Sequence, residues 1–369
     1  MKILIINWRD IKHPAAGGAE ELTFEVARRW VQWGHEVTWF AAGFPGGQEE
    51  EVLEGVRIIR RGKQITVHFK AFRYYKNRGK GHFDVVIDEI NTIPFFTPLY
   101  VKEKHVAYIN QLAKEVWFYE MPFPVNLLGY LIEPLFLRTY RKTPIITISE
   151  STRDDLHKLG AKKVVVVHPG FSGVPLSELP KPIEKAQRPT VLYVGRVVPS
   201  KRVNEIIKAI SLVRERVPEV QLQVAGSISQ SYLSKLEREV KNYNLEKNVT
   251  FLGKISFHER QTLMKQAHLL ALASVREGWG LVVIEANALG TPAVVYKVPG
   301  LVDSVQDGKT GLVTPHNDPQ SLADKISSGL LDDSFREELS RGALEWSRQF
   351  TWQRNAEGFL KFLEDDKHE

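Results

Sequence analysis

The chain has 369 residues, 43% of them hydrophobic and 25% charged, which predicts a soluble globular protein of two domains. It has no cysteine, which excludes disulfides and thiolate chemistry, and no apolar run approaches the roughly 20 residues of a membrane-spanning helix. The net charge of +6 is concentrated, because residues 55–83 contain nine Lys or Arg and no Asp or Glu. The excess therefore indicates a local basic patch and not a basic protein.

The first part of the chain alternates short apolar runs with helical patterns. Residues 2–7 are expected to form a buried strand. This apolar run is too short for a signal peptide, so we expect a cytoplasmic protein. A helical pattern follows Gly17-Gly18 and stops at Gly34, and a strand at 37–41 completes a β-α-β unit typical of a parallel sheet. Further strands are expected at 84–88, 106–109, 145–149 and 164–168, with a helix at 125–141.

A proline-rich segment divides the chain. Residues 173–189 contain four prolines and little periodicity, which predicts a linker between a first domain at 1–172 and a second at 190–351. After the linker, strands are expected at 190–194, 221–225, 249–252, 269–273 and 293–296, with helices between them. The predicted fold class is α/β, with two doubly wound domains and a cleft between them.

The stretch REGWGLVVIEANALGTPAV (276–294) predicts a ligand site. A strand ends at Ala273, a loop follows, and a helix begins near Leu281, so free N–H groups of a helix N-terminus lie at the carboxyl edge of a parallel sheet and favour phosphate. Gly278 and Gly280 would let a ligand approach the backbone. Glu277 precedes the helix and Glu285 lies a turn inside it, so both can face one ligand. For this pair taken alone, an ordinary solvated Glu285 is the favoured alternative.

Two further constellations suit a diphosphate. In VLYVGRVVPSKRV (191–203), Arg196 and Lys201 follow a buried strand, and two cations at that position suit phosphate groups. Lys201 taken alone is better interpreted as an ordinary surface cation. Gly17-Gly18 precedes the first helix of the first domain and is either a plain loop or a backbone cradle for phosphate facing the cations of the second domain.

Together these motifs resemble one known family. The chain is similar to the retaining glycosyltransferases of family 4, also called glycosyl transferases group 1, which have the GT-B fold of two Rossmann-like domains facing a central cleft. The resemblance covers nearly the whole chain. It is carried by S-x2-EGWGLVVIEANALGTPAVV (274–295), VGR-x4-K (194–201), FLG (251–253), PG (299–300), DGKTGLV (307–313) and GGAE (17–20).

The resemblance implies a role for each candidate residue. Arg196 and Lys201 would hold the diphosphate of a nucleotide-sugar donor, Glu277 would contact the donor sugar, and Glu285 would bind the ribose. The remaining contacts would come from the backbone at Gly278, Gly280, Leu281 and Val282, from Gly17 and Gly18 closing on the phosphates, and from Lys254 and Ile255 beside the base. A final helix at about 352–369 would return to the first domain.

The resemblance also implies the reaction. A hexose would move from UDP- or GDP-hexose, with UDP preferred on family frequency, to an acceptor, with retention of the α configuration. There is no DxD motif, and the 11 histidines form no H-x-H or i,i+4 pair, so we expect no metal and no cofactor. Cations and a helix dipole would replace the metal.

Two positions depart from the family pattern. Relatives often have a histidine after the strand at 106–109, where this chain has Asn110, and an amide can hydrogen-bond a sugar but cannot exchange protons usefully. The usual Lys-Gly is Lys201-Arg202 here. Because Asn110 replaces this histidine, a non-catalytic sugar-nucleotide-binding subunit on the same fold remains an alternative interpretation of the chain. Another GT-B enzyme, such as a sugar-nucleotide epimerase or a phosphorylase, is less favoured because E-x7-E is intact and no pyridoxal-lysine motif is present.

The prediction of the acceptor is based on amino-acid composition. Aromatic residues interleave with the cations of residues 57–80, which form either a solvated basic surface or a docking site for an anionic membrane, making the protein peripheral at the cytoplasmic face. The same composition suits single-stranded nucleic acid, but the family resemblance argues against a nucleic-acid partner. The apolar stretch 117–136 either lines an acceptor entrance or forms core. We expect a saccharide or lipid-linked saccharide acceptor.

Overall fold

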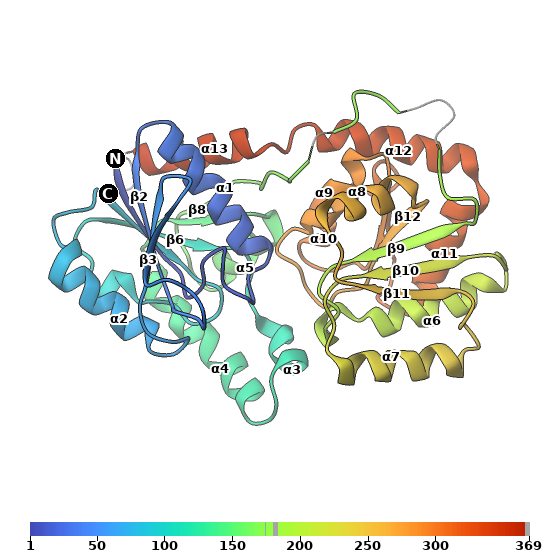
Figure 1. The fold of residues 1–369 in the computed structure, drawn as a ribbon, viewed down its shortest axis with the longest axis horizontal. Coiled ribbons are helices and arrows are strands. Elements are labelled where there is room, and N and C mark those ends of the chain that lie inside the picture. Colours follow the sequence, from blue (N-terminus) through green and yellow to red (C-terminus); the bar gives the residue numbers. More distant parts are fainter. Residues whose placement is uncertain (174, 180–183, 366–369) are drawn as a thin grey trace. The chain divides into compact units, whose positions relative to one another are not determined.

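The computed structural model describes residues 1–173, 175–179 and 184–365. The chain divides into two compact units (Figure 1). The first contains residues 1–114, 123–170 and the chain from Thr351 onwards, and the second contains 115–122 and 171–350. The predicted boundaries did not anticipate that 115–122 belongs to the second unit. Residues 174 and 180–183 of the predicted linker, and 366–369 of the predicted final helix, lie outside the described residues.

The first unit is built on an eight-stranded sheet in the order β3-β4-β2-β1-β5-β6-β7-β8. Its strands are parallel except β3, which is antiparallel to β4 at one edge. The predicted parallel sheet is confirmed, but β3 and β4 were not predicted. The strands are β1 (Lys2–Ile6), β2 (Glu36–Ala41), β3 (Glu50–Leu53), β4 (Val56–Arg60), β5 (Val85–Glu89), β6 (Lys104–Ile109), β7 (Ile145–Thr147) and β8 (Val164–Val166).

The described residues of the first unit form five α-helices, and all of them except α4 bury an apolar face against the unit. They include α1 (Gly18–Gln32), α2 (Val67–Tyr74), α4 (Val125–Leu137), α5 (Glu150–Lys158) and α13 (Trp352–Glu364). In α1 the buried side chains recur at helical spacing and end in Trp30. The Trp30 indole N–H donates to the Ala356 carbonyl at 3.1 Å, and its ring meets Phe359 edge-on at 5.9 Å. These contacts hold α13 against α1.

The second unit has a six-stranded, fully parallel sheet in the order β11-β10-β9-β12-β13-β14. The strands are β9 (Thr190–Val194), β10 (Gln221–Ala225), β11 (Val249–Gly253), β12 (Leu269–Leu272), β13 (Ala293–Val295) and β14 (Gly311–Val313). The helices are α3 (Trp117–Glu120), α6 (Val203–Arg214), α7 (Gln230–Asn242), α8 (Phe257–Gln266), α9 (Leu281–Ala288), α10 (Leu301–Ser304), α11 (Pro319–Leu331) and α12 (Asp333–Ser347).

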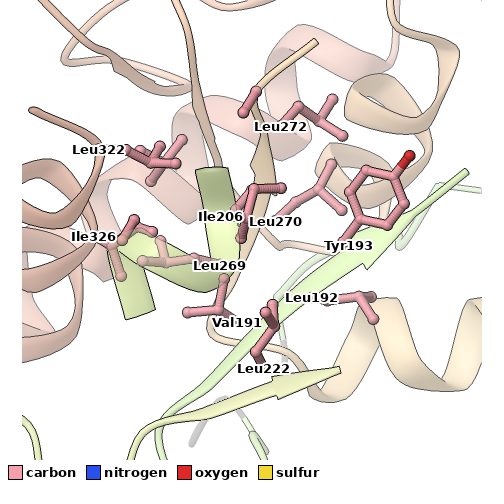
Figure 2. Packing of buried hydrophobic residues seen from close by; sticks show 14 of the residues in the cluster. Val191, Leu192, Tyr193, Ile206, Leu222, Leu269, Leu270, Leu272, Leu322 and Ile326 are labelled. Carbon is pink, nitrogen blue, oxygen red and sulfur yellow. The ribbon is translucent and has the colours of Figure 1, made fainter. Parts of the chain in front are cut away.

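The core of the second unit explains its near-continuous apolar strands. Leu192 and Leu270, on the paired strands β9 and β12, are fully buried, as are Ile206 of α6 and Leu322 of α11 (Figure 2). A parallel sheet covered by helices on both faces buries both sides of each strand, so its strands need apolar residues at successive positions. The core therefore fixes the strand ends at which the candidate site lies.

The apolar stretch 117–136 is mostly exposed, so its interpretation as core is wrong. Within α4 only Glu133 and Leu137 are buried, and large apolar side chains on the rest of the helix reach solvent. Pro134 lies inside α4, and a short 3-10 helix (Arg138–Tyr140) follows it. In the part of the chain that the structure describes, no helix combines the length and the apolar character needed to cross a membrane.

Candidate functional site

The candidate residues of the second unit lie in loops at one edge of its sheet. Strands β11, β10, β9 and β12 are adjacent and parallel, so their carboxyl ends meet at the same edge. Lys254 and Ile255 follow β11, Arg196 and Lys201 follow β9, and residues 274–280 follow β12. Loops far apart in sequence are thus brought to one edge, as the sequence predicts.

The turn after β9 is held by a tyrosine and a glycine. The Tyr193 hydroxyl donates to the Arg196 carbonyl at 2.9 Å, and burial raises the pKa of this tyrosine well above its usual value. A Cβ at Gly226, after β10, would lie 1.7 Å from the Gly195 carbonyl oxygen. The two turns can therefore approach only because Gly226 has no side chain. Arg196 itself is exposed.

Lys201 and Glu277 form an ion pair. The Lys201 ammonium lies 2.6 Å from Glu277 Oε1, which also accepts a hydrogen bond of 2.7 Å from the Ser274 hydroxyl. Both charged side chains are about one-fifth exposed. A pair with this exposure contributes at most about 1 kcal/mol to stability, so its main effect is to position the two groups. Lys201 is therefore not an isolated surface cation.

The conformation of the loop before α9 depends on two glycines, Gly280 and Gly300. The Glu277 N–H donates to the Pro299 carbonyl at 3.1 Å, and a Cβ at Gly300 would lie 2.2 Å from the Glu277 carbonyl oxygen. Gly300 also has a φ of +82°. Gly280 has a φ of +89° and caps the start of α9, whose first residues Leu281 and Val282 are half-buried. The predicted helix N-terminus at the sheet edge is confirmed.

Glu285 has a different cation as its partner. Its carboxylate lies 3.3 Å from Arg260 of α8, and its side chain is only 8% exposed. It lines a small pocket together with Arg260 and two aromatic residues, Phe171 and Phe257. The alternative of a solvated helix residue is wrong, because Glu285 is buried. The structure therefore places Glu277 beside Lys201 and Glu285 beside Arg260.

Sequence reasoning missed the residues that support these loops. Ser274 lies inside the predicted motif, three residues before Glu277, and its small polar side chain was the available signal. Glu120 of α3 accepts a hydrogen bond from the Ser200 hydroxyl, next to Lys201. Arg276 lies 3.3 Å from Glu115. Nothing in the apolar surroundings of Glu115 and Glu120 indicated that they join the second unit.

In the first unit, Gly17 and Gly18 lie at the start of α1. The Gly17 N–H donates to Glu20 Oε2 at 2.7 Å, which satisfies one of the amides predicted to cradle phosphate. Gly17 has a φ of −147°, which any residue adopts, and a Cβ there would meet only Glu20 Oε2 at 4.0 Å. The fold itself does not require glycine at position 17.

Glu89 is the last residue of β5, and Asn110 directly follows the adjacent strand β6. Asn110 is 9% exposed, and neither atom of its side-chain amide has a hydrogen-bond partner among the described residues. Glu89 is fully buried and accepts a 2.8 Å hydrogen bond from the Thr23 hydroxyl. Burial, and then the charge of Glu20, raise the pKa of Glu89 to about 8.

In the described residues, His, Asp and Glu side chains form no cluster of three or more that could hold a metal ion.

The predicted basic patch is smaller than the range 57–80. Arg60 is 2% exposed and is bound by Asp10 and Glu51, each at 2.6 Å. Arg57 and Arg61 pair with acidic residues of the β3 segment. The prediction of a basic surface is therefore wrong for residues 57–61. Acidic residues of the β3–β4 hairpin, which was not predicted, neutralise the cations there. Beyond this paired end, the exposed cations are Lys63, Lys70, Arg73, Lys76, Arg78 and Lys80.

Two family models match the chain in succession. The model of glycosyltransferase family 4 matches residues 16–172, and the model of glycosyl transferases group 1 matches residues 177–346. The chain is a family 4 glycosyltransferase. The first match contains Gly17, Gly18 and Asn110, and the second contains the whole candidate site of the second unit.

Relatives and solved structures agree with this family. The D-inositol 3-phosphate glycosyltransferase of Jonesia denitrificans is 29% identical over 238 residues, which cover 60% of this glycosyltransferase and 56% of the relative. That of Nocardioides is 30% identical over 55% of this chain and 48% of its own length. The chain thus spans about half the length of these relatives.

The solved structures show the fold. Sucrose-phosphate synthase from Thermosynechococcus elongatus superimposes with a TM-score of 0.80 and 22% identity over 98% of both chains. Anabaena HepE, solved in complex with UDP and glucose, has a TM-score of 0.73 and 19% identity over 98% of this chain and 99% of its own. The glycosyltransferase therefore has the GT-B fold.

The buried Glu89 predicts how stability depends on pH. Its folded pKa of about 8 lies above the ordinary value of 4.5, so the unfolded state ionises first and stability falls as pH rises through this window. Glu89→Gln, which is uncharged and similar in shape, should remove this loss. The melting temperature of the variant should exceed that of the wild type by a margin that grows from about pH 5 to about pH 8. The exposed Glu36→Gln is the control, and parallel melting curves for Glu89→Gln and wild type would contradict the prediction.

Proposed function

We propose that this enzyme transfers a hexose from a nucleotide sugar to a hydroxyl of a saccharide or lipid-linked saccharide, with retention of the α configuration. The single observation that carries the proposal is the Lys201–Glu277 contact of 2.6 Å at the carboxyl edge of the second sheet. A sugar diphosphate needs a cation for its phosphates and an acceptor of hydroxyl hydrogen bonds for its sugar, at adjacent positions. Lys201 and Glu277 provide both groups within one loop cluster.

The leaving group determines what these residues do. The bond between the anomeric carbon and the phosphate oxygen breaks, and the nucleoside diphosphate departs with an added negative charge. Arg196, Lys201 and the N-terminus of α9 would stabilise that charge. The acceptor oxygen forms its bond to the anomeric carbon on the face that the diphosphate leaves. The proton of the acceptor hydroxyl passes to the departing phosphate oxygen, which balances the step without a base from the protein and without a metal.

Glu285 and the glycines support the assignment of the donor. Glu285 is buried at the pocket it shares with Arg260, where a carboxylate can accept hydrogen bonds from ribose hydroxyls. The fold would accommodate a side chain at position 17, yet the residue is glycine. The absence of a side chain there favours close approach of a ligand to the backbone. UDP is the preferred nucleotide, since HepE is solved with UDP. Lys254 and Ile255 beside the base, and Gly18 and Gly278 beside the phosphates, stay predictions.

The acceptor is proposed from the surface of the first unit. The exposed cations of residues 63–80 suit an anionic membrane, at up to about 1 kcal/mol for each cation near the surface. A lipid-linked saccharide would be presented there, and the enzyme would act as a peripheral protein of the cytoplasmic face. A nucleic-acid partner is not proposed.

The proposed function is tested first by donor binding and turnover. Thermal melting with a panel of nucleoside diphosphates and their sugars should show stabilisation by UDP and a UDP-hexose, because a ligand at ten times its Kd adds roughly 1.4 kcal/mol. Release of UDP should continue in EDTA, and the product anomer followed by NMR should be α. Binding without turnover, with membrane extracts as acceptors, would favour a non-catalytic subunit. No melting shift with any nucleotide would overturn the site.

The two glutamates should separate binding from turnover. Glu285→Ala should weaken UDP affinity about tenfold or more, because hydrogen bonds to a charged group are worth roughly 1.5–3 kcal/mol. Glu277→Ala should lower turnover of a UDP-hexose while sparing UDP affinity, because its contacts are to the sugar. Calorimetric titration and steady-state kinetics measure the two effects. Glu237→Ala, exposed on α7, is the control, and equal effects of both substitutions would mean that the roles are misassigned.

Asn110 should act on turnover without supporting stability. Its buried amide has no hydrogen-bond partner among the described residues, and an unsatisfied buried amide costs about 1–3 kcal/mol, so Asn110→Ala should leave the melting temperature unchanged or raise it. If the amide contacts the donor sugar, the same variant should lower kcat/KM about tenfold. Gln32→Ala, at the exposed end of α1 in the same unit, is the control. A loss of stability with unchanged kcat/KM would show that Asn110 serves only the fold.

A further inference from the structure

Helix α4 exposes apolar side chains that a folded protein normally buries. Seven large apolar or aromatic residues between positions 123 and 135 are exposed, and Phe123, just before the helix, is 77% exposed. Monomeric proteins rarely expose large contiguous apolar patches, and those that occur mark interaction sites. The exposed residues are Phe123, Val125, Leu127, Leu128, Tyr130, Leu131 and Leu135.

The orientation of α4 is fixed by its one acidic residue. The Glu133 carboxylate accepts hydrogen bonds from the Ala113 and Lys114 amides at 2.6 and 2.8 Å. Glu133 and Leu137 are the buried residues of the helix. Leu128, Leu131 and Leu135 are spaced three and four apart, so they share the opposite face. The helix thus presents its polar residue to the protein and its leucines to the outside.

Exposed cations lie at the carboxyl end of α4. Arg138, Arg141 and Lys142 follow the helix directly and are exposed. The Phe136 ring of α4 meets Phe96 at 5.3 Å, and Tyr100, four residues after Phe96, meets Phe72 of α2 at 5.1 Å. Leu99 lies between Phe96 and Tyr100 in the chain and is exposed. The segment 96–100 thus contacts both α4 and α2, whereas Lys70 and Arg73 of α2 line a separate pocket with Glu50 and Arg61.

We propose that α4 lies in the interface of an anionic lipid bilayer, with Leu128, Leu131 and Leu135 in the acyl region and the flanking cations at the headgroups. Its 13 residues span about 20 Å, too short to cross a hydrocarbon core of about 30 Å but suited to lying along the surface. A second copy of the chain fits less well. Each copy has a net charge of +6, so charge opposes the association of two copies, whereas an anionic bilayer attracts the chain.

The membrane contact of α4 rests on the proposed function in one respect only. It is the lipid-linked acceptor of that function that needs an enzyme at the membrane surface. The surface itself follows from α4 and its neighbours. It also adds to the electrostatic docking of residues 63–80, because insertion of apolar side chains resists salt whereas charge attraction is screened. Partial retention on vesicles at high salt therefore separates insertion from docking by charge alone.

Because the chain has no cysteine, one introduced thiol can report on α4. Leu131→Cys is labelled with an environment-sensitive fluorophore, and Leu331→Cys at the end of α11 is the matched control, since the two leucines are 56% and 63% exposed. With phosphatidylcholine–phosphatidylglycerol vesicles, the label at 131 should brighten and shift to the blue, and nitroxide-bearing lipids should quench it. The label at 331 should not respond. A label at 131 that stays in a polar environment while the protein floats with the vesicles would overturn insertion.

Substitution of an exposed leucine by glutamate tests how much α4 contributes to vesicle binding. Leu131→Glu should reduce vesicle binding in flotation about tenfold or more, because burial of a leucine side chain is worth about 1.5–3 kcal/mol, whereas Leu331→Glu should not. Both substitutions are at exposed sites, and unchanged melting curves confirm the fold. Self-association by α4 would appear instead as a concentration-dependent blue shift without vesicles, which overturns the bilayer as occupant. The UDP melting shift, measured on the same variants without lipid, reports separately on the proposed function.

Discussion

The contact between Lys201 and Glu277 ties together two loops that lie 76 residues apart in sequence, and the candidate site is built around it. A pair that is one-fifth exposed adds little stability, so its importance is geometric. The cation and the acid are opposite in charge and suit different parts of a nucleotide sugar. A diphosphate would compete for Lys201, and sugar hydroxyls would compete for the Glu277 oxygen. The pair thus keeps both groups in place while leaving each of them exchangeable.

The parallel sheet makes this contact possible, and glycines let its loops close on each other. Adjacent strands β9 and β12 end at one edge, so Lys201 and Glu277 need only short loops to meet. The turns after β9 and β10 approach to a distance that only Gly226 allows, and the chain around Gly300 passes as closely over Glu277. These two glycines serve the fold. Gly17, where a side chain would meet only one atom at van der Waals distance, does not, and this difference separates a glycine needed for packing from one that leaves room for a ligand.

The sequence was sufficient to predict what depends on local pattern. Alternating apolar strands and helices predicted both sheets, and the glycine-spaced loop predicted the N-terminus of α9 at the sheet edge. Long-range contacts could not be predicted. The β3–β4 hairpin neutralises Arg60 through Glu51, which removes that cation from the surface, and no periodicity in residues 50–60 indicated it. Segment 115–122 joins the second unit through Glu115 and Glu120, whose partners lie more than 70 residues away.

Helix α4 shows why an apolar pattern alone does not establish burial. An amphipathic helix of a globular protein places apolar residues inward and charges outward. In α4 the order is reversed, because Glu133 points inward and satisfies two backbone amides while the leucines point outward. The sequence pattern is the same in both orientations, and only the inward acid distinguishes them. Since exposure of these leucines to water is unfavourable, the reversed polarity supports the proposal that this face lies against an apolar medium.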